Sequence, residues 1–115
     1  MGRMYRPVEL SFKDNKIVSV SIVDTGADET VISERLAQKI KAELYGTFRA
    51  ICASDTVLEG KYADIEIMDI WSNKKANMVV GVSDVPFDTD DIDDEGVDVI
   101  LGTDFIQKTE LEITL

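Results

Sequence analysis

Three consecutive residues, Asp24-Thr25-Gly26, have the types and spacing best suited to chemistry. They follow residues 17–23, where apolar and small polar side chains alternate with the period of two that is typical of a half-buried strand. The glycine allows a tight loop, so the Asp24 carboxylate is expected at the end of a strand. The triplet alone is a moderate signal. Chance would place it in a chain of this length on the order of a few per cent of the time, as a turn with a capping aspartate.

The remaining composition narrows the chemistry. The chain has no histidine, which excludes Ser-His and Cys-His nucleophilic pairs and any zinc site that uses imidazole. The one cysteine, Cys52, has no histidine to activate it, so a small buried hydrophobe is the better interpretation than a nucleophile. Acid–base chemistry at neutral or acidic pH must therefore be carried by carboxylates.

Size and charge limit the other function classes. A chain of 115 residues, 44% apolar and 30% charged, is expected to form a single domain over residues 1–115. Its net charge of −11, with no Lys/Arg cluster, predicts no nucleic-acid partner. No apolar run approaches the roughly 20 residues that span a bilayer, and the basic start lacks a signal-peptide core. We expect a cytoplasmic protein without a membrane partner.

Hydrophobic periodicity predicts mostly strands. Strands are expected at residues 8–12, 17–23, 48–53, 57–70, 78–82, 97–102 and 111–115. A helix is expected over residues 33–42, with Ser33 as its N-cap, and one or two helical turns over 103–108. Many short strands with one or two short helices indicate an all-β fold, a compact and mainly antiparallel β barrel or sandwich.

A second motif makes the first one specific. Some seventy residues after the triplet come Ile100-Leu101-Gly102 and then a helical segment. Residues 23–28, Val-Asp-Thr-Gly-Ala-Asp, together with this motif resemble the retropepsins, the retroviral and retroviral-like aspartic peptidases, and the order of elements is similar over residues 8–115. The resemblance implies the acid protease barrel, a homodimer with two β-hairpin flaps and interleaved terminal strands, a polypeptide substrate, and neither cofactor nor metal.

The physical reason for a dimer can be stated separately. Peptide hydrolysis without a metal needs a base that activates water and an acid that protonates the carbonyl or the leaving group. Two carboxylates about 3 Å apart share one proton and serve both roles, a behaviour already established for aspartic proteases in general. The sequence has one Asp-Thr-Gly, so a twofold dimer would supply the other half.

The resemblance also implies residue roles. Asp24 would be the catalytic carboxylate, Thr25 would join the two loops across the dimer, and Gly26 would let the substrate backbone approach. The expected substrate-binding residues are Ala27, Asp28, Glu29, Val31, Ile32, Ile51, Ala53, Ser54 and Val57. The expected supporting residues are Thr30, Leu101, Gly102 and Asp104, with Thr30 and Asp104 as an internal hydrogen-bonded pair.

The sequence departs from the viral pattern in two places. The flap, residues 49–61, has no glycine at its tip, where viral relatives are glycine-rich. Thr103 follows Gly102 where viral relatives carry an arginine, which leaves Asp28 with Arg6 or with no partner. This version of the second motif and the longer helix after Ser33 are similar to the cellular and prokaryotic branch.

Two alternatives remain open. An inactive dimerisation or peptide-binding module would keep the fold, and the flap sequence favours it. The acidic run at residues 88–98 matches the early positions of a calcium loop, but Gly102 stands where the bidentate glutamate is required, so a solvated loop is the better interpretation. Trp71 is expected to pack at a hairpin end.

Overall fold

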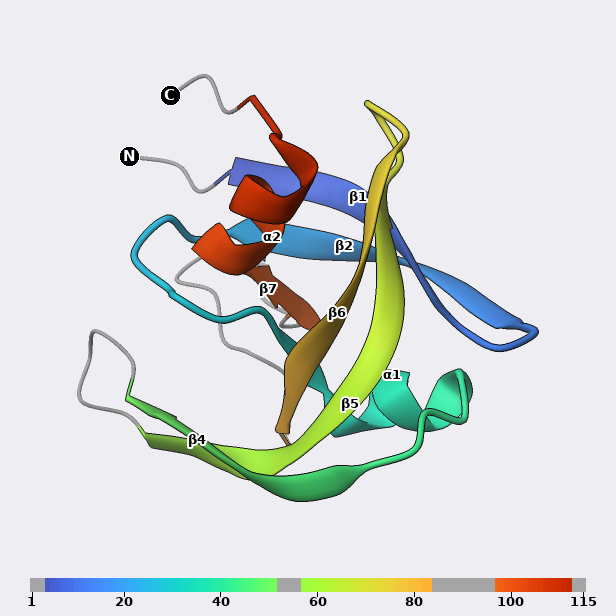
Figure 1. The fold of residues 1–115 in the computed structure, drawn as a ribbon, viewed down its shortest axis with the longest axis vertical. Coiled ribbons are helices and arrows are strands. Elements are labelled where there is room, and N and C mark those ends of the chain that lie inside the picture. Colours follow the sequence, from blue (N-terminus) through green and yellow to red (C-terminus); the bar gives the residue numbers. More distant parts are fainter. Residues whose placement is uncertain (1–3, 52–56, 84–96, 113–115) are drawn as a thin grey trace.

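The computed structural model describes residues 4–51, 57–83 and 97–112. Strands dominate this part of the chain, and two short helices complete it (Figure 1). The elements in chain order are β1 (Met4–Phe12), β2 (Asn15–Val23), β3 (Val31–Ser33), α1 (Glu34–Lys39), β4 (Tyr45–Ile51), β5 (Val57–Asp69), β6 (Lys74–Ser83), β7 (Val99–Leu101) and α2 (Thr103–Thr109).

The strands form a closed barrel. Their order is β1-β2-β7-β3-β6-β5, and the pairing of β1 with β5 closes the circle, while β4 continues the sheet beyond β5. Most pairs are antiparallel; the exceptions are β2 with β7 and β3 with β6. The predicted fold class, an all-β and mainly antiparallel barrel with short helices, is confirmed.

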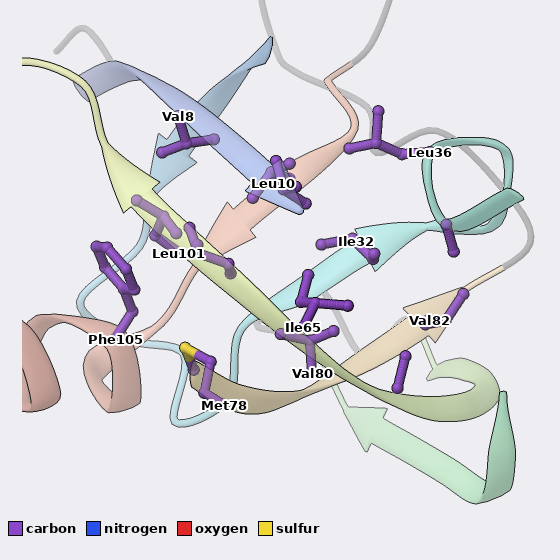
Figure 2. Close-up of a cluster of buried hydrophobic side chains, with 14 of the residues drawn as sticks. Val8, Leu10, Ile32, Leu36, Ile65, Met78, Val80, Val82, Leu101 and Phe105 are labelled. Carbon is purple, nitrogen blue, oxygen red and sulfur yellow. The ribbon is translucent and has the colours of Figure 1, made fainter. Parts of the chain in front are cut away.

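One apolar core fills the barrel (Figure 2). Alternate residues of β1 and β5, such as Leu10 and Ile67, point inward and are fully buried. Leu36 of α1 and Phe105 of α2 close the core from its two sides. A smaller cluster, Ile22, Val31, Phe48 and Val97, lies outside the main core. Alternation therefore indicates the buried face of β1 and β5 but not that of β2, where Val18 and Val20 are 61% and 51% exposed and Ser21 is fully buried.

The first helix is shorter than predicted. Ser33 is its N-cap, as expected, because the Ser33 hydroxyl accepts from Leu36 N over 3.2 Å. The helix ends at Lys39 rather than at residue 42, since Ile40 is the C-cap and Lys41 has a positive φ of 58°. The predicted end of this helix near residue 42 is therefore wrong, while its length relative to viral relatives stays a prediction.

Other boundaries differ as well. β3 was not predicted, β4 begins at Tyr45 rather than at residue 48, and residues 111–112 are not a strand. The predicted flap tip and most of the acidic run lie outside the described residues, as does the end of the predicted closing strand. No helix in the described ranges is long and apolar enough to cross a membrane.

Candidate active site

The Asp24 loop leaves the end of β2 and is fixed by its own backbone. Val23 pairs with Leu101 of β7, and the next amide, Asp24 N, donates to the Leu101 carbonyl over 2.9 Å. Ala27 N then donates to the Asp24 carbonyl over 3.1 Å, closing the turn. Gly26 N donates to Asp24 Oδ1 over 2.9 Å. These bonds orient the carboxylate, and Asp24 itself remains exposed.

Thr30 joins this loop to the second motif. Its hydroxyl donates to Asp104 Oδ1 over 2.7 Å and accepts from Gly102 N over 3.1 Å. Its amide donates to Asp104 Oδ2 over 3.1 Å, and its carbonyl accepts from Gly81 N over 3.0 Å. Thr30 is fully buried, so water cannot replace these partners. The predicted hydrogen-bonded pair of Thr30 and Asp104 is present.

The approach of the two motifs also depends on Gly102. A Cβ at this position would lie 2.7 Å from Glu29 C and 2.8 Å from Ala27 O, both backbone atoms that cannot move alone. The neighbouring Thr103 N donates to the Ala27 carbonyl over 2.8 Å. Glycine is therefore the residue that lets α2 begin directly against the Asp24 loop.

A cavity of about 370 Å³ opens beside the Asp24 carboxylate. Its lining comes from the Asp24 loop, from β3 and β7, and from the β4–β5 hairpin. These residues are Asp24, Gly26, Ala27, Asp28, Glu29, Val31, Arg49, Ala50, Leu58 and Ile100. Ala50 and Leu58 pair across the hairpin and pack against the small apolar cluster that contains Val31. The cavity therefore has apolar walls and an acidic side near Asp24.

The base of the β4–β5 hairpin is anchored by the ring of Phe48. The Phe48 ring is fully buried and lies over Gly81, where a Cβ would come within 2.5 Å of the ring. Tyr62 meets the same ring edge-on, with ring centroids 5.5 Å apart. Because Gly81 N also donates to Thr30, the flap hairpin and the Asp24 loop rest on the same point of β6.

The acidic side chains Asp28 and Glu29 share the cavity lining with one cation, Arg49. Asp28 and Glu29 are exposed, and within the described ranges neither forms an ion pair. Arg6, which was considered as the partner of Asp28, instead forms a bidentate pair with Asp69. That alternative is therefore wrong.

Two ion pairs outside the cavity, Arg6–Asp69 and Arg35–Asp98, connect separate elements of the barrel. Burial would raise the pKa of Asp69, but hydrogen bonds from Arg6 and Ser72 and the charge of Arg6 outweigh it, so this pKa is lowered. The pKa of Asp98 is lowered in the same way, because bonds from Arg35 and Ser33 outweigh its burial. Ser33 N also donates to the Asp98 carbonyl over 2.8 Å, which ties the residue before β7 to α1.

Only some of the other predicted substrate-binding residues line the cavity. Ala27 and Val31 line the cavity as expected. Ile32 does not: it is fully buried in the main core (Figure 2), because successive strand residues face opposite sides. Val57 is 41% exposed and is not among the lining residues of the described chain. Ile51 ends β4.

The remaining predictions divide between surface, core and the part not described. Thr25 is exposed, and Leu101 is fully buried in the main core while its carbonyl accepts from Asp24 N. Ala53 and Ser54 lie outside the described residues. Sequence reasoning missed Ala50, Leu58, Ile100 and Arg49 as lining residues. Alternation along the two flap arms was the available clue for the first two.

Chemically, the arrangement offers an exposed carboxylate on a rigid loop beside a cavity for a side chain. In the described ranges, no three His, Cys, Asp or Glu side chains are placed to hold a metal ion.

Two solved structures share the fold of this chain. The solved structures include the EIAV protease complexed with the inhibitor HBY-793, which is 19% identical with a TM-score of 0.67 and a match covering 99% of this chain and 94% of that one. They also include the retroviral protease-like domain of Ddi1 from Leishmania major, 14% identical with a TM-score of 0.60, covering 100% and 83%. These likenesses show the retropepsin-like fold.

No curated protein matches the sequence significantly. The family model described as aspartyl protease matches residues 8–105, which include both motifs and the whole cavity lining. By this match the chain belongs to the aspartyl protease family.

Proposed function

We propose that the protein is an endopeptidase that works as a homodimer, with one Asp24 from each subunit forming the catalytic pair. The observation that carries the proposal is the exposed Asp24 carboxylate at the edge of a side-chain cavity, where it accepts from Gly26 N while the Asp24 amide donates to the Leu101 carbonyl. An isolated surface turn would need neither the buried Thr30–Asp104 brace nor the cavity. Both are arrangements that hold a reacting group in place.

The reaction follows from a shared proton. With two Asp24 carboxyl groups side by side, one is ionised and takes a proton from a water molecule as that water attacks the peptide carbonyl. The other, protonated, donates to the carbonyl oxygen and so stabilises the tetrahedral intermediate. Proton transfer to the leaving nitrogen then breaks the C–N bond and restores the shared proton. The chain's own carboxyl groups suffice for each step.

The substrate would lie between the Asp24 loop and the β4–β5 hairpin in an extended form. Its side chain would enter the cavity between Ala50 and Leu58 on one side and Val31 on the other. Gly26 and Ala27 keep the floor low enough for a polypeptide backbone. Asp28 and Glu29 are exposed acceptors for main-chain amides.

A second function keeps the same fold without cleavage. The flap has no glycine from residue 47 to residue 59, which favours a dimerisation or peptide-binding module over a flap that opens and closes. In such a module the cavity would bind a peptide that is then released intact.

The test is cleavage of a mixed peptide library from about pH 3 to pH 7 by the wild type and by Asp24→Asn. The substitution removes the ionisable group and keeps the side-chain shape, and a surface change of this kind alters stability by about 0.5 kcal/mol or less. Cleavage by the wild type that is lost in the variant supports the carboxylate pair. Equal cleavage by both proteins places the activity elsewhere. Two folded, dimeric and inert proteins favour the binding module.

A further inference from the structure

The closed end of the β5–β6 hairpin touches both ends of the described chain. Asp69 and Lys74 are directly opposite each other in this hairpin. Asp69 binds Arg6, near the start of β1, and Lys74 Nζ donates to the Glu110 carbonyl just after α2 over 2.8 Å. One pair of residues therefore holds two elements that are far apart in sequence.

The Asp69 contact is a buried and fully bonded ion pair. Oδ1 accepts from Arg6 Nε over 2.7 Å, and Oδ2 accepts from Arg6 Nη2 over 2.6 Å. Oδ2 also accepts from the Ser72 amide over 3.0 Å and from its hydroxyl over 2.6 Å. The Asp69 side chain has no exposed surface. A buried carboxylate with this many donors fixes the position of its partner more strictly than a surface pair would.

Arg6 also contacts two further residues, Ser21 and Trp71. Its carbonyl accepts from the buried Ser21 hydroxyl over 2.8 Å, three residues before Asp24 on β2. Its guanidinium lies over the ring of Trp71, 4.9 Å from the centroid. Trp71 is the chain's single tryptophan, and 66% of it is exposed. At this hairpin end Trp71 thus packs against the Arg6 guanidinium, as its expected packing role requires.

Both clamped elements begin or end beside the catalytic loop. Met4 pairs with Val23, the residue before Asp24, so the start of β1 lies next to the loop. α2 begins against the loop as well, through Thr103 N and the Ala27 carbonyl. Two Asp24 carboxylates about 3 Å apart require the second subunit to approach this edge. The start of β1 and the α2 segment are therefore close to where that subunit docks.

We propose that Arg6, Asp69 and Lys74 form a clamp that positions the start of β1 and the end of α2 for docking of a second copy of the chain. The inference rests on the proposed homodimeric function. The three side chains do not touch the reacting atoms, and they act as positioning residues through the subunit contact. Loss of the clamp should weaken assembly, and the activity of each dimer that still forms should stay unchanged.

The chain contains a matched control for this proposal. Asp98 also receives a bidentate arginine, Arg35, and a serine hydroxyl, from Ser33. It lies before β7, at the opposite end of that strand from Leu101. Asp69→Asn and Asp98→Asn therefore remove similar charges from similar partners, one inside the clamp and one outside it.

The experiment is a dilution series of wild type, Asp69→Asn and Asp98→Asn in the analytical ultracentrifuge at about pH 6. We expect Asp69→Asn to raise the dimer dissociation constant about tenfold or more, equivalent to about 1.4 kcal/mol. Asp98→Asn should change it by about twofold or less, because the partners of Asp98 are Arg35 and Ser33 and lie outside the clamp. Peptidase activity at high Asp69→Asn concentration should return to the wild-type rate per dimer, a recovery that a misfolded site would not show.

Lys74→Met keeps the test decisive if Asp69→Asn does not fold. It removes only the bond to the Glu110 carbonyl from a partly exposed residue, and it should weaken the dimer in the same direction. Trp71 fluorescence is an independent readout, because loss of the Arg6 contact should change its emission in Asp69→Asn and leave it unchanged in Asp98→Asn.

The outcomes separate the clamp from the proposed function. Equal dimer dissociation constants for wild type, Asp69→Asn and Lys74→Met would overturn the clamp. If the wild-type dimer cleaves peptides in that case, the proposed peptidase function still stands. Equal weakening by Asp69→Asn and Asp98→Asn also overturns it, since the effect would then be general. A dimer that is weakened only by the clamp variants but cleaves nothing supports the clamp and rejects the peptidase. A wild type that is monomeric at every concentration overturns both.

Discussion

The hydroxyl of Thr30 donates to Asp104 across 74 positions of sequence, over 2.7 Å, and the Thr30 amide reaches the other oxygen of the same carboxylate. The same hydroxyl accepts from Gly102 N. One buried side chain therefore fixes both the loop after Asp24 and the start of α2. The position of the Asp24 carboxylate depends on these bonds, although none of them touches it.

Thr30→Val should destabilise the fold by about 3 kcal/mol. The substitution keeps the shape and removes a hydroxyl that both donates and accepts, leaving Gly102 N and an Asp104 oxygen without this partner, and each such loss costs about 1–3 kcal/mol. Urea unfolding at neutral pH measures the change. Thr47→Val on the exposed face of β4 is the control and should change stability by about 0.5 kcal/mol or less. A Thr30→Val cost as small as that of the control would contradict the brace.

Two glycine substitutions should separate packing from catalysis. Gly102→Ala places a Cβ against the backbone of Ala27 and Glu29 and should cost about 1–3 kcal/mol of stability as the loop is displaced. A Cβ at Gly26 meets only Asp24 Oδ1, at 3.3 Å, so Gly26→Ala should change stability by less than about 1 kcal/mol. It should still lower kcat/KM by about hundredfold by displacing the carboxylate and the substrate backbone.

Unfolding curves and peptide cleavage, measured on both glycine variants, check this contrast. Similar stability losses in the two variants would show that an added methyl group is accommodated equally well at Gly26 and at Gly102. A fully active Gly26→Ala would show that the floor beside Asp24 tolerates a methyl group during catalysis.

The sequence was sufficient for the features that depend on local pattern. Alternation predicted most of the barrel strands, and the family resemblance carried by the two motifs implied the roles of Asp24 and Gly102 and the Thr30–Asp104 pair. The sequence was insufficient to assign the buried face where two apolar residues are adjacent. Val31 and Ile32 give no alternation, so only the register of β3 against β7 shows that Val31 faces the cavity and Ile32 the core.

The partners in long-range ion pairs could not be predicted from the sequence either. Arg6 could have met any of 23 acidic residues, and its partner Asp69 lies 63 positions away. The β1–β5 pairing decides between them, because it sets Val8 opposite Asp69 and brings the start of β1 to the hairpin end. β3 was missed for a related reason: three residues before a helix cap carry too few side chains to show a period of two.

Acid should destabilise the fold through Asp69 and Asp98. Their pKa values are lowered in the folded state, so the folded chain holds fewer protons than the unfolded chain, where an aspartate pKa is about 3.9. Their contribution is complete well above that value and is lost as the pH falls below it through the folded-state pKa. Urea unfolding at about pH 6, 4.5 and 3 measures this loss.

Asp69→Asn tests the assignment of that pH dependence. The variant should be less stable than the wild type at about pH 6, by about 3 kcal/mol for a buried ion pair with one charge removed, and should lose less stability than the wild type as the pH falls. The two curves should therefore converge in acid. Parallel curves would mean that other carboxyl groups are responsible.

Ala50→Leu should change which peptides are cleaved without changing the fold. Ala50 is only partly buried and lines the 370 Å³ cavity opposite Val31, so a leucine there fills part of the space meant for a substrate side chain. Peptides with large aliphatic residues should lose about tenfold or more in kcat/KM relative to those with small ones, since one methylene is worth about 1–3 kcal/mol in such a pocket. Library cleavage profiles measure the shift, and Val79→Leu, on the exposed side of β6, is the control for added bulk. A profile that stays the same in Ala50→Leu would show that the substrate side chain does not enter this cavity.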